Sequence, residues 1–194
     1  KTKNDGITIH WLPLKYSNNM NFFNRLKVFF TFAWKAYFKA KKIEADIIYA
    51  SSTPLTIAIP AVFTKLKKNI PMVFEVRDLW PDVPIAMKIL KNPFLIYVAK
   101  LLELWAYKNS NSIVALSPQM KKGIIAKKID PKKIAVIPNS SDLEKFSFDK
   151  KLALNFRNRR QWLKNRPLLL YTGTFGKVNA LDYTIKLAKS LMMQ

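Results

Sequence analysis

The stretch IPMVFEVRDLWPD, residues 70–82, is an apolar run that ends in an arginine and an aspartate. Apolar runs of this length are typical of strands that are buried on both faces of a parallel sheet. Similar runs occur as ADIIYAS at 45–51, SIVALS at 112–117 and KIAVIPN at 133–139. Helical patterns separate these runs, and such alternation favours a doubly wound α/β fold with right-handed crossovers.

The two ends of the chain follow different patterns. GITIHWLPL, residues 6–14, alternates with a period of two and predicts another strand. After residue 139 the regularity lapses, and a basic helix is expected over 151–163. RPLLLYTGTFGKVNALD, residues 166–182, then starts a new strand, glycine turn and helix. We therefore expect one domain over 1–166 and the beginning of a second over 167–194.

Residues 22–42 form a helical pattern whose apolar arc is wider than one core-facing stripe needs. At the helical angle per residue, its aromatic and aliphatic side chains fill an arc of about 200°. Lysines occupy most of the remainder. The excess apolar surface suits a lipid surface, and it equally suits a missing strand or the partner in a homodimer.

Composition excludes several classes of chemistry. The 194 residues contain no cysteine and one histidine, which removes disulfide and thiolate chemistry and disfavours a catalytic triad or a protein-only zinc site. The apolar runs are shorter than the roughly 18–20 residues that a membrane-spanning helix needs. No metal and no membrane span are expected.

The net charge is the strongest compositional signal. Lysine and arginine number 34 against 12 acidic residues, which gives +22 at neutral pH. Such a charge predicts an anionic partner, which is a nucleic acid, a nucleotide phosphate or a phospholipid surface. The alternative is a set of solvated, lysine-rich helix faces.

Ligands of open α/β sheets bind beyond the carboxyl ends of the strands, so the residues that leave those ends are the candidate site. They are mostly small hydroxyls and amides. The set is Ser51, Ser52, Thr53, Arg77, Asp78, Ser117, Pro118, Asn139, Ser140 and Ser141.

Arg77 and Asp78 are the charged pair of this set. A functional interpretation has Arg77 meeting a phosphate or a sugar hydroxyl, while Asp78 accepts hydrogen bonds from a sugar or positions the arginine. Trp80 would then form a wall against a sugar ring. The structural alternative is a salt bridge that closes the strand end, with Asp78 as a helix cap and Trp80 in the core.

A glycine turn near the end of the chain suits a phosphate. In YTGTFGK, residues 171–177, Gly173, Thr174, Gly176 and Lys177 stand between an expected strand and an expected helix. Glycines let backbone N–H groups approach a phosphate, and a helix N-terminus and a lysine add positive charge. The stretch is neither a Walker loop nor a Gly-x-Gly-x-x-Gly fingerprint.

Several stretches together resemble glycosyltransferase family 4, the retaining enzymes of GT-B fold. FEVRDLWPD, residues 74–82, resembles a signature of its bacterial capsule, lipopolysaccharide and exopolysaccharide transferases, such as L-fucosamine transferases. Arg77 stands where broader relatives carry the histidine of a His-Asp pair. SIVALSPQMKKGI, residues 112–124, resembles the family's serine turn.

Two later stretches extend the resemblance. KIAVIPNSSDLEKF, residues 133–146, resembles the Pro-Asn-Gly-x-Asp-x-x-x-Phe segment, with Ser140 in place of the glycine. LLLYTGTFGKVNALD, residues 168–182, resembles the first strand and phosphate turn of the donor-binding domain. The family's usual first strand and its paired-glutamate motif are absent, so we expect a Rossmann-like, acceptor-side domain that is incomplete as an enzyme.

The resemblance implies an activity and its partners. The expected reaction moves a sugar, in the manner of a hexosyltransferase, from a nucleotide-diphosphate donor to a polyprenyl-diphosphate-linked saccharide in surface polysaccharide synthesis. No cofactor is implied. The expected place is the cytoplasmic face of the plasma membrane, where lysines beside exposed aromatics suit an anionic surface.

Five residues are expected to contact the acceptor in addition to the charged pair: Ser52 and Thr53 after the first core strand, Trp80 after the second, and Ser117 and Asn139 after the last two. Two rival functions stay open, a nucleic-acid-binding module and a non-catalytic subunit that docks the acceptor. The basic residues are spread over helices without a nucleic-acid-binding motif, which weighs against the first rival.

Overall fold

The computed structural model describes residues 1–17, 19–52, 54–173 and 179–192. The chain divides into two compact units, Lys1–Asn139 and Ser140–Gln194. The boundary expected between residues 166 and 167 falls inside the second unit and remains a prediction.

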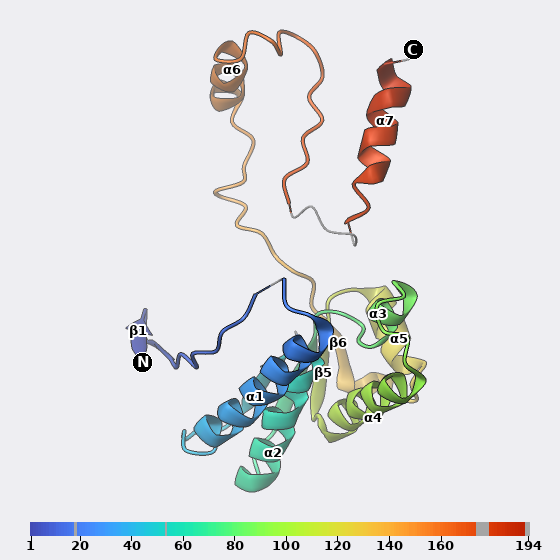
Figure 1. Cartoon of the computed structure of the whole chain (residues 1–194). Helices are drawn as coiled ribbons and strands as arrows, with labels where there is room; N and C mark the ends of the chain where they lie inside the picture. Colours follow the sequence, from blue (N-terminus) through green and yellow to red (C-terminus); the bar gives the residue numbers. More distant parts are fainter. Residues whose placement is uncertain (18, 53, 174–178, 193–194) are drawn as a thin grey trace. The chain divides into compact units, whose positions relative to one another are not determined.

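A four-stranded parallel sheet forms the centre of the first unit (Figure 1). Its strands are β3 (Ile48–Ser51), β4 (Met72–Val76), β5 (Ser112–Ala115) and β6 (Ile134–Val136), in the order β3-β4-β5-β6. Ser51 pairs with Glu75, and Val76 pairs with Ala115, so the carboxyl ends of neighbouring strands lie level. The α/β fold class and the parallel sheet predicted from the apolar runs are confirmed.

Helices cover the sheet, and helices and strands both contribute to the core. A 3₁₀ turn (Leu55–Ile57) leads into α2 (Ala58–Lys68), which packs against both α1 (Phe22–Ala40) and α4 (Pro93–Asn109). Helix α5 (Pro118–Ile125) packs against β5 and β6. In β4, Met72, Phe74 and Val76 are buried and alternate with half-buried residues, because successive strand residues point to opposite faces.

The strand expected at residues 6–14 does not join the parallel sheet. Residues 2–9 form an antiparallel hairpin of β1 (Thr2–Asn4) and β2 (Ile7–Ile9), which is a separate two-stranded sheet. Asp5 and Gly6 both have positive φ, 47° and 80°. This is the conformation of a type I′ turn, so the Asp-Gly pair closes a local hairpin.

The second unit contains two helices within its described residues, α6 (Lys150–Asn158) and α7 (Asp182–Met192). The Asp149 side chain accepts hydrogen bonds from the N–H groups of Lys151 and Leu152 and so caps α6. The strand expected in the stretch at 166–182 is not formed in its described residues 166–173. Among the described residues, no helix is long and apolar enough to cross a bilayer.

Candidate functional site

A polar pocket of about 560 Å³ lies at the carboxyl ends of the parallel strands. Its lining residues come from the ends of all four strands. They are Ser51, Arg77, Asp78, Leu116 and Asn139. The level register of the strands explains why residues that are far apart in sequence meet here.

Arg77 and Asp78 are both exposed at the rim of this pocket. Between these two described residues the structure has no ion pair, so the salt-bridge interpretation of the sequence is not what the structure shows. Nor does the Asp78 side chain cap α3 (Asp82–Ala86), whose N-cap residue is Pro81. Only the backbone carbonyl of Asp78 is engaged, accepting from the Trp80 N–H at 2.9 Å. Both charged groups can therefore face a ligand.

Ser52 lies beneath the pocket instead of lining it. The residue is buried, and its backbone N–H donates to the Glu75 carbonyl at 2.9 Å. Its hydroxyl oxygen accepts from the backbone N–H of Arg77 at 3.2 Å. Ser52 thus joins the ends of β3 and β4 and fixes the backbone that carries the guanidinium. Thr53, the next candidate, lies outside the described residues.

We expect Ser52→Ala to destabilise the protein by about 1–3 kcal/mol, because it removes the acceptor of the Arg77 N–H at a part-buried position. Ser140→Ala is the matched control, since Ser140 is exposed, and it should stay within about 0.5 kcal/mol of the parent. Urea denaturation measures both differences. Equal stability of the two variants would contradict the role given to the Ser52 hydroxyl.

The other three candidates take separate positions. Ser117 caps α5, because its hydroxyl oxygen accepts from the Met120 N–H at 3.2 Å. Trp80 is half-buried against the core, and its bond to Pro81 is cis. Asn139 is exposed at the pocket. The structure therefore brings Asn139 to the charged pair and places Ser117 and Trp80 outside the pocket lining.

Glu75, which contacts the pocket residue Ser51, is a residue that the sequence analysis missed. The Ser51 hydroxyl donates to its carboxylate in a short hydrogen bond. Glu75 lies on β4 and Arg77 directly follows its last residue, so the two residues lie on the same side of the extended chain, opposite Phe74 and Val76. A lone acidic residue within an otherwise apolar strand was the available signal.

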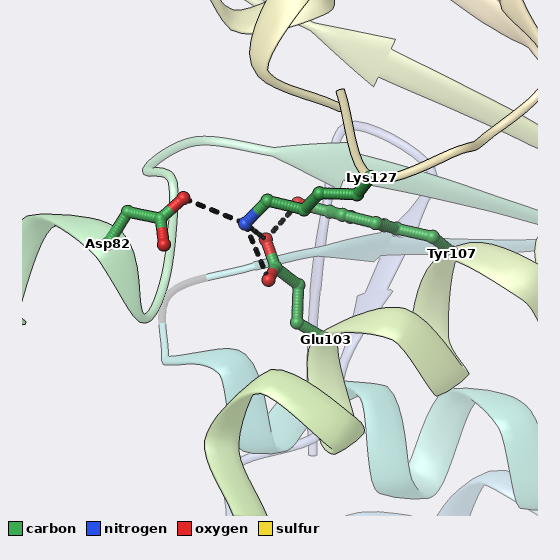
Figure 2. A network of polar contacts seen from close by, with 4 residues as sticks. All are labelled: Asp82, Glu103, Tyr107 and Lys127. Atoms are coloured by element: carbon green, nitrogen blue, oxygen red, sulfur yellow. Dashed lines mark hydrogen bonds and ion pairs between the residues drawn. The ribbon is translucent and has the colours of Figure 1, made fainter. Parts of the chain in front are cut away.

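A partly buried polar network of Asp82, Glu103, Tyr107 and Lys127 holds the elements that follow Arg77 and Asp78 (Figure 2). The Lys127 ammonium contacts both carboxylate oxygens of Glu103 at 2.6 Å and Asp82 at 2.7 Å. The Tyr107 hydroxyl donates to Glu103 at 3.0 Å. The network joins the start of α3 to α4 and to the residues after α5, so it fixes the loop from Arg77 to Pro81 at its far end.

Burial and charge act against each other in this network. Burial raises the pKa of Glu103, and the hydrogen bonds from Lys127 and Tyr107 offset only part of the rise. Burial alone would lower the pKa of Lys127, but the carboxylates of Asp82 and Glu103 outweigh it and raise that pKa. Burial and the neighbouring Glu103 also raise the pKa of Tyr107, which keeps its proton as a donor.

The glycine turn that was expected to bind a phosphate is described only at its beginning, and its role remains a prediction. A Cβ atom on Gly173 would lie 2.6 Å from the Tyr171 hydroxyl, so any side chain here would displace that ring. Thr174, Gly176 and Lys177 lie outside the described residues. Among the residues that are described, no cluster of histidine, aspartate or glutamate could hold a metal ion.

Comparison with known proteins identifies a family and several similar solved structures. The model of Glycosyltransferase Family 4 matches residues 3–145. The crystal structure of Anabaena Alr3699/HepE in complex with UDP and glucose is similar over 66% of this chain, with 16% sequence identity and a TM-score of 0.48. The match covers 32% of that protein, so the chain spans about a third of its length. No curated protein matches the chain.

Proposed function

Because the chain belongs to glycosyltransferase family 4, we propose that it is the acceptor-side part of a retaining enzyme that transfers a sugar from a nucleotide diphosphate to a lipid-linked saccharide. The resemblance of FEVRDLWPD to the signature of bacterial transferases favours surface polysaccharide assembly, in a capsule or a lipopolysaccharide. The acceptor would be a polyprenyl diphosphate that carries a saccharide, reached at the inner face of the plasma membrane.

The observation that supports this proposal is the pocket at the strand ends. It presents one guanidinium and one carboxylate that do not neutralise each other, with the amide of Asn139 beside them. Arg77 would bind a phosphate or a sugar hydroxyl through charge-assisted hydrogen bonds. Asp78 would accept hydrogen bonds from the hydroxyls of the sugar. The donor diphosphate would be neutralised by a helix N-terminus and Lys177, so the mechanism needs no metal ion.

The direct test uses a protein that carries both halves of the GT-B fold. We expect it to transfer a sugar from at least one nucleotide-diphosphate donor to a prenyl-diphosphate-linked saccharide, with the product detected by mass spectrometry. A panel of uridine, guanosine and thymidine diphosphate sugars covers the donor classes. Tight binding of duplex DNA or single-stranded RNA at physiological salt, with no transfer from any donor, would overturn the proposal in favour of a nucleic-acid-binding module.

Attachment to the membrane surface is part of the same proposal. Phe23 on α1 and Phe94 on α4 are 75% and 69% exposed, and Lys27 and Lys91 stand near them in sequence. Trp34 suits this role less well, because it stacks on Phe63 of α2 at 5.9 Å between ring centroids.

We expect the Phe23→Ser and Phe94→Ser double variant to bind anionic vesicles several-fold more weakly than the parent, because it loses two apolar contacts with the interface. Its melting temperature should stay close to that of the parent. Leu66→Ser on α2, where Leu66 is 60% exposed, is the control for removing an exposed apolar side chain elsewhere. Vesicle sedimentation measures the binding of the parent, the double variant and the control. Equal binding by all three would contradict the role of Phe23 and Phe94 in membrane attachment.

A further inference from the structure

A second cavity in the first unit is larger and almost entirely apolar. Its volume is about 710 Å³, within the range of pockets that enclose drug-sized ligands. It lies between the segment at residues 12–16, helix α1, the 3₁₀ turn and helix α4. Among its lining residues, Arg25 is charged and Thr56 carries an aliphatic hydroxyl. The others are aliphatic, aromatic or proline.

The walls of this cavity are held by packing within the unit. Tyr16 stacks on Phe29 of α1, with ring centroids 6.0 Å apart, and this contact joins the end of the segment at residues 12–16 to the helix. Leu55 of the 3₁₀ turn and Leu90, which precedes α4, are buried. An apolar space of this size suits a hydrocarbon, because polar groups placed in it would find few hydrogen-bond partners.

The apolar cavity and the polar pocket are built from the same two loops. Trp80 lines the cavity and stands two residues after Asp78, which lines the pocket. Pro54 lines the cavity and stands three residues after Ser51, which lines the pocket. A ligand that fills both spaces must therefore combine a hydrocarbon part with a polar head.

The charges beside the cavity indicate the sign of that head. Lys15, Lys27, Lys88 and Lys91 are exposed, and each is adjacent in sequence to a lining residue. Arg77 adds a cation at the polar pocket. Positive charge around an apolar space is complementary to an anionic lipid head group.

We propose that this cavity holds the hydrocarbon chain of the lipid diphosphate acceptor, whose head group reaches Arg77 in the polar pocket. The identity of this lipid rests on the proposed function, whereas the binding of the chain itself can be measured without sugar transfer. The cavity would select acceptors by the length of the chain next to the diphosphate. It would also hold the diphosphate at a fixed distance from the membrane surface.

The test is a calorimetric titration of this chain with geranyl, farnesyl and geranylgeranyl diphosphate, below their micelle concentrations, and with inorganic diphosphate. We expect the affinity to rise at least about tenfold from the ten-carbon to the twenty-carbon probe, since each buried CH₂ favours binding. Equal affinities for all four probes would overturn the proposal. If light scattering shows that the chain forms a dimer that covers the cavity, and no lipid probe binds, the proposal would also be overturned.

Two cavity variants and one control test whether the hydrocarbon chain binds in this cavity. Ala99→Phe fills the cavity from α4 and should abolish the dependence on chain length, whereas Ala86→Phe adds the same ring at an exposed position outside the cavity and should preserve it. Val98→Asp is a second cavity variant, because Val98 lines the cavity while 42% exposed and a charge there should be tolerated by the fold. Preserved chain-length dependence in either correctly folded cavity variant would overturn the proposal.

The outcome for the cavity is separable from the outcome for the proposed function. A two-domain enzyme that transfers sugar equally to acceptors of all chain lengths would retain the function and remove the cavity's role. Binding that depends on chain length, in a protein that transfers no sugar, would leave the cavity as a lipid site and remove the function.

Discussion

Arg77→Ala in the two-domain enzyme should lower kcat/KM at least about tenfold, while the free energy of unfolding changes by no more than about 0.5 kcal/mol. The side chain is exposed and forms no ion pair with the neighbouring Asp78, so its removal costs the fold little. The backbone N–H that donates to Ser52 is unchanged by the substitution. A hydrogen bond to a charged group contributes about 1.5–3 kcal/mol, and a tenfold loss corresponds to the low end of this range.

Two further variants sharpen this result. Arg77→Lys keeps the charge but loses the planar fork, so it should recover only part of the activity if the guanidinium binds a phosphate in a bidentate manner. Arg159→Ala removes an exposed arginine from the residues after α6 and controls for a general loss of positive charge. Activity of the Arg77→Ala enzyme equal to that of the Arg159→Ala enzyme would exclude Arg77 from the site.

The sheet could be predicted from the sequence because its strands are continuous apolar runs, which few other structures tolerate. Phe74 and Ile113 have the burial that those runs predict. The N-terminal hairpin was missed because the alternating pattern at residues 6–14 does not specify its partner strand. The Asp5–Gly6 turn did carry that information, since two consecutive residues with positive φ close a hairpin locally.

The site was predictable only as a set of strand ends. The topology rule placed Arg77, Asp78 and Asn139 at one edge of the sheet, and the pocket does contain all three. It could not separate Ser51, which lines the pocket, from Ser52, which is buried beneath it, because the distinction depends on the side-chain alternation at the end of β3. Nor could it find Glu103 and Lys127, which are 24 residues apart and meet only through the packing of α4 against the residues after α5.

Lys127→Met should strongly destabilise the protein, lowering the free energy of unfolding by about 3–5 kcal/mol at neutral pH. The side chain of Glu103 is only 2% exposed, and Lys127 is the cation that compensates its charge. Methionine fills a similar volume but leaves the carboxylate with the Tyr107 hydroxyl as its remaining partner in the network. Lys122→Met on the exposed side of α5 is the matched control and should stay within about 0.5 kcal/mol of the parent.

The destabilisation should depend on pH in a direction that the Glu103 pKa sets. Burial already raises this pKa in the parent, and loss of Lys127 must raise it further. A carboxyl group whose pKa is higher in the folded state binds protons more strongly there, so the variant gains stability as the pH falls through that pKa toward the unfolded value of about 4.3. The difference in unfolding free energy between variant and parent should therefore narrow near pH 5.

In the parent, the raised pKa of Lys127 gives a contribution to the free energy of unfolding that is complete below about pH 10.4. This contribution is lost as the pH rises through the folded-state pKa.

A double-mutant cycle with Glu103→Gln separates the charge from the packing. Glutamine still accepts a hydrogen bond from Tyr107 but carries no charge, so Glu103→Gln combined with Lys127→Met should recover most of the stability that Lys127→Met loses. Urea denaturation followed by tryptophan fluorescence, at pH 5 and pH 7, measures all four corners of the cycle. Additive losses with no change between the two pH values would mean that Glu103 is uncharged in the native protein, and the network would then act through its hydrogen bonds alone.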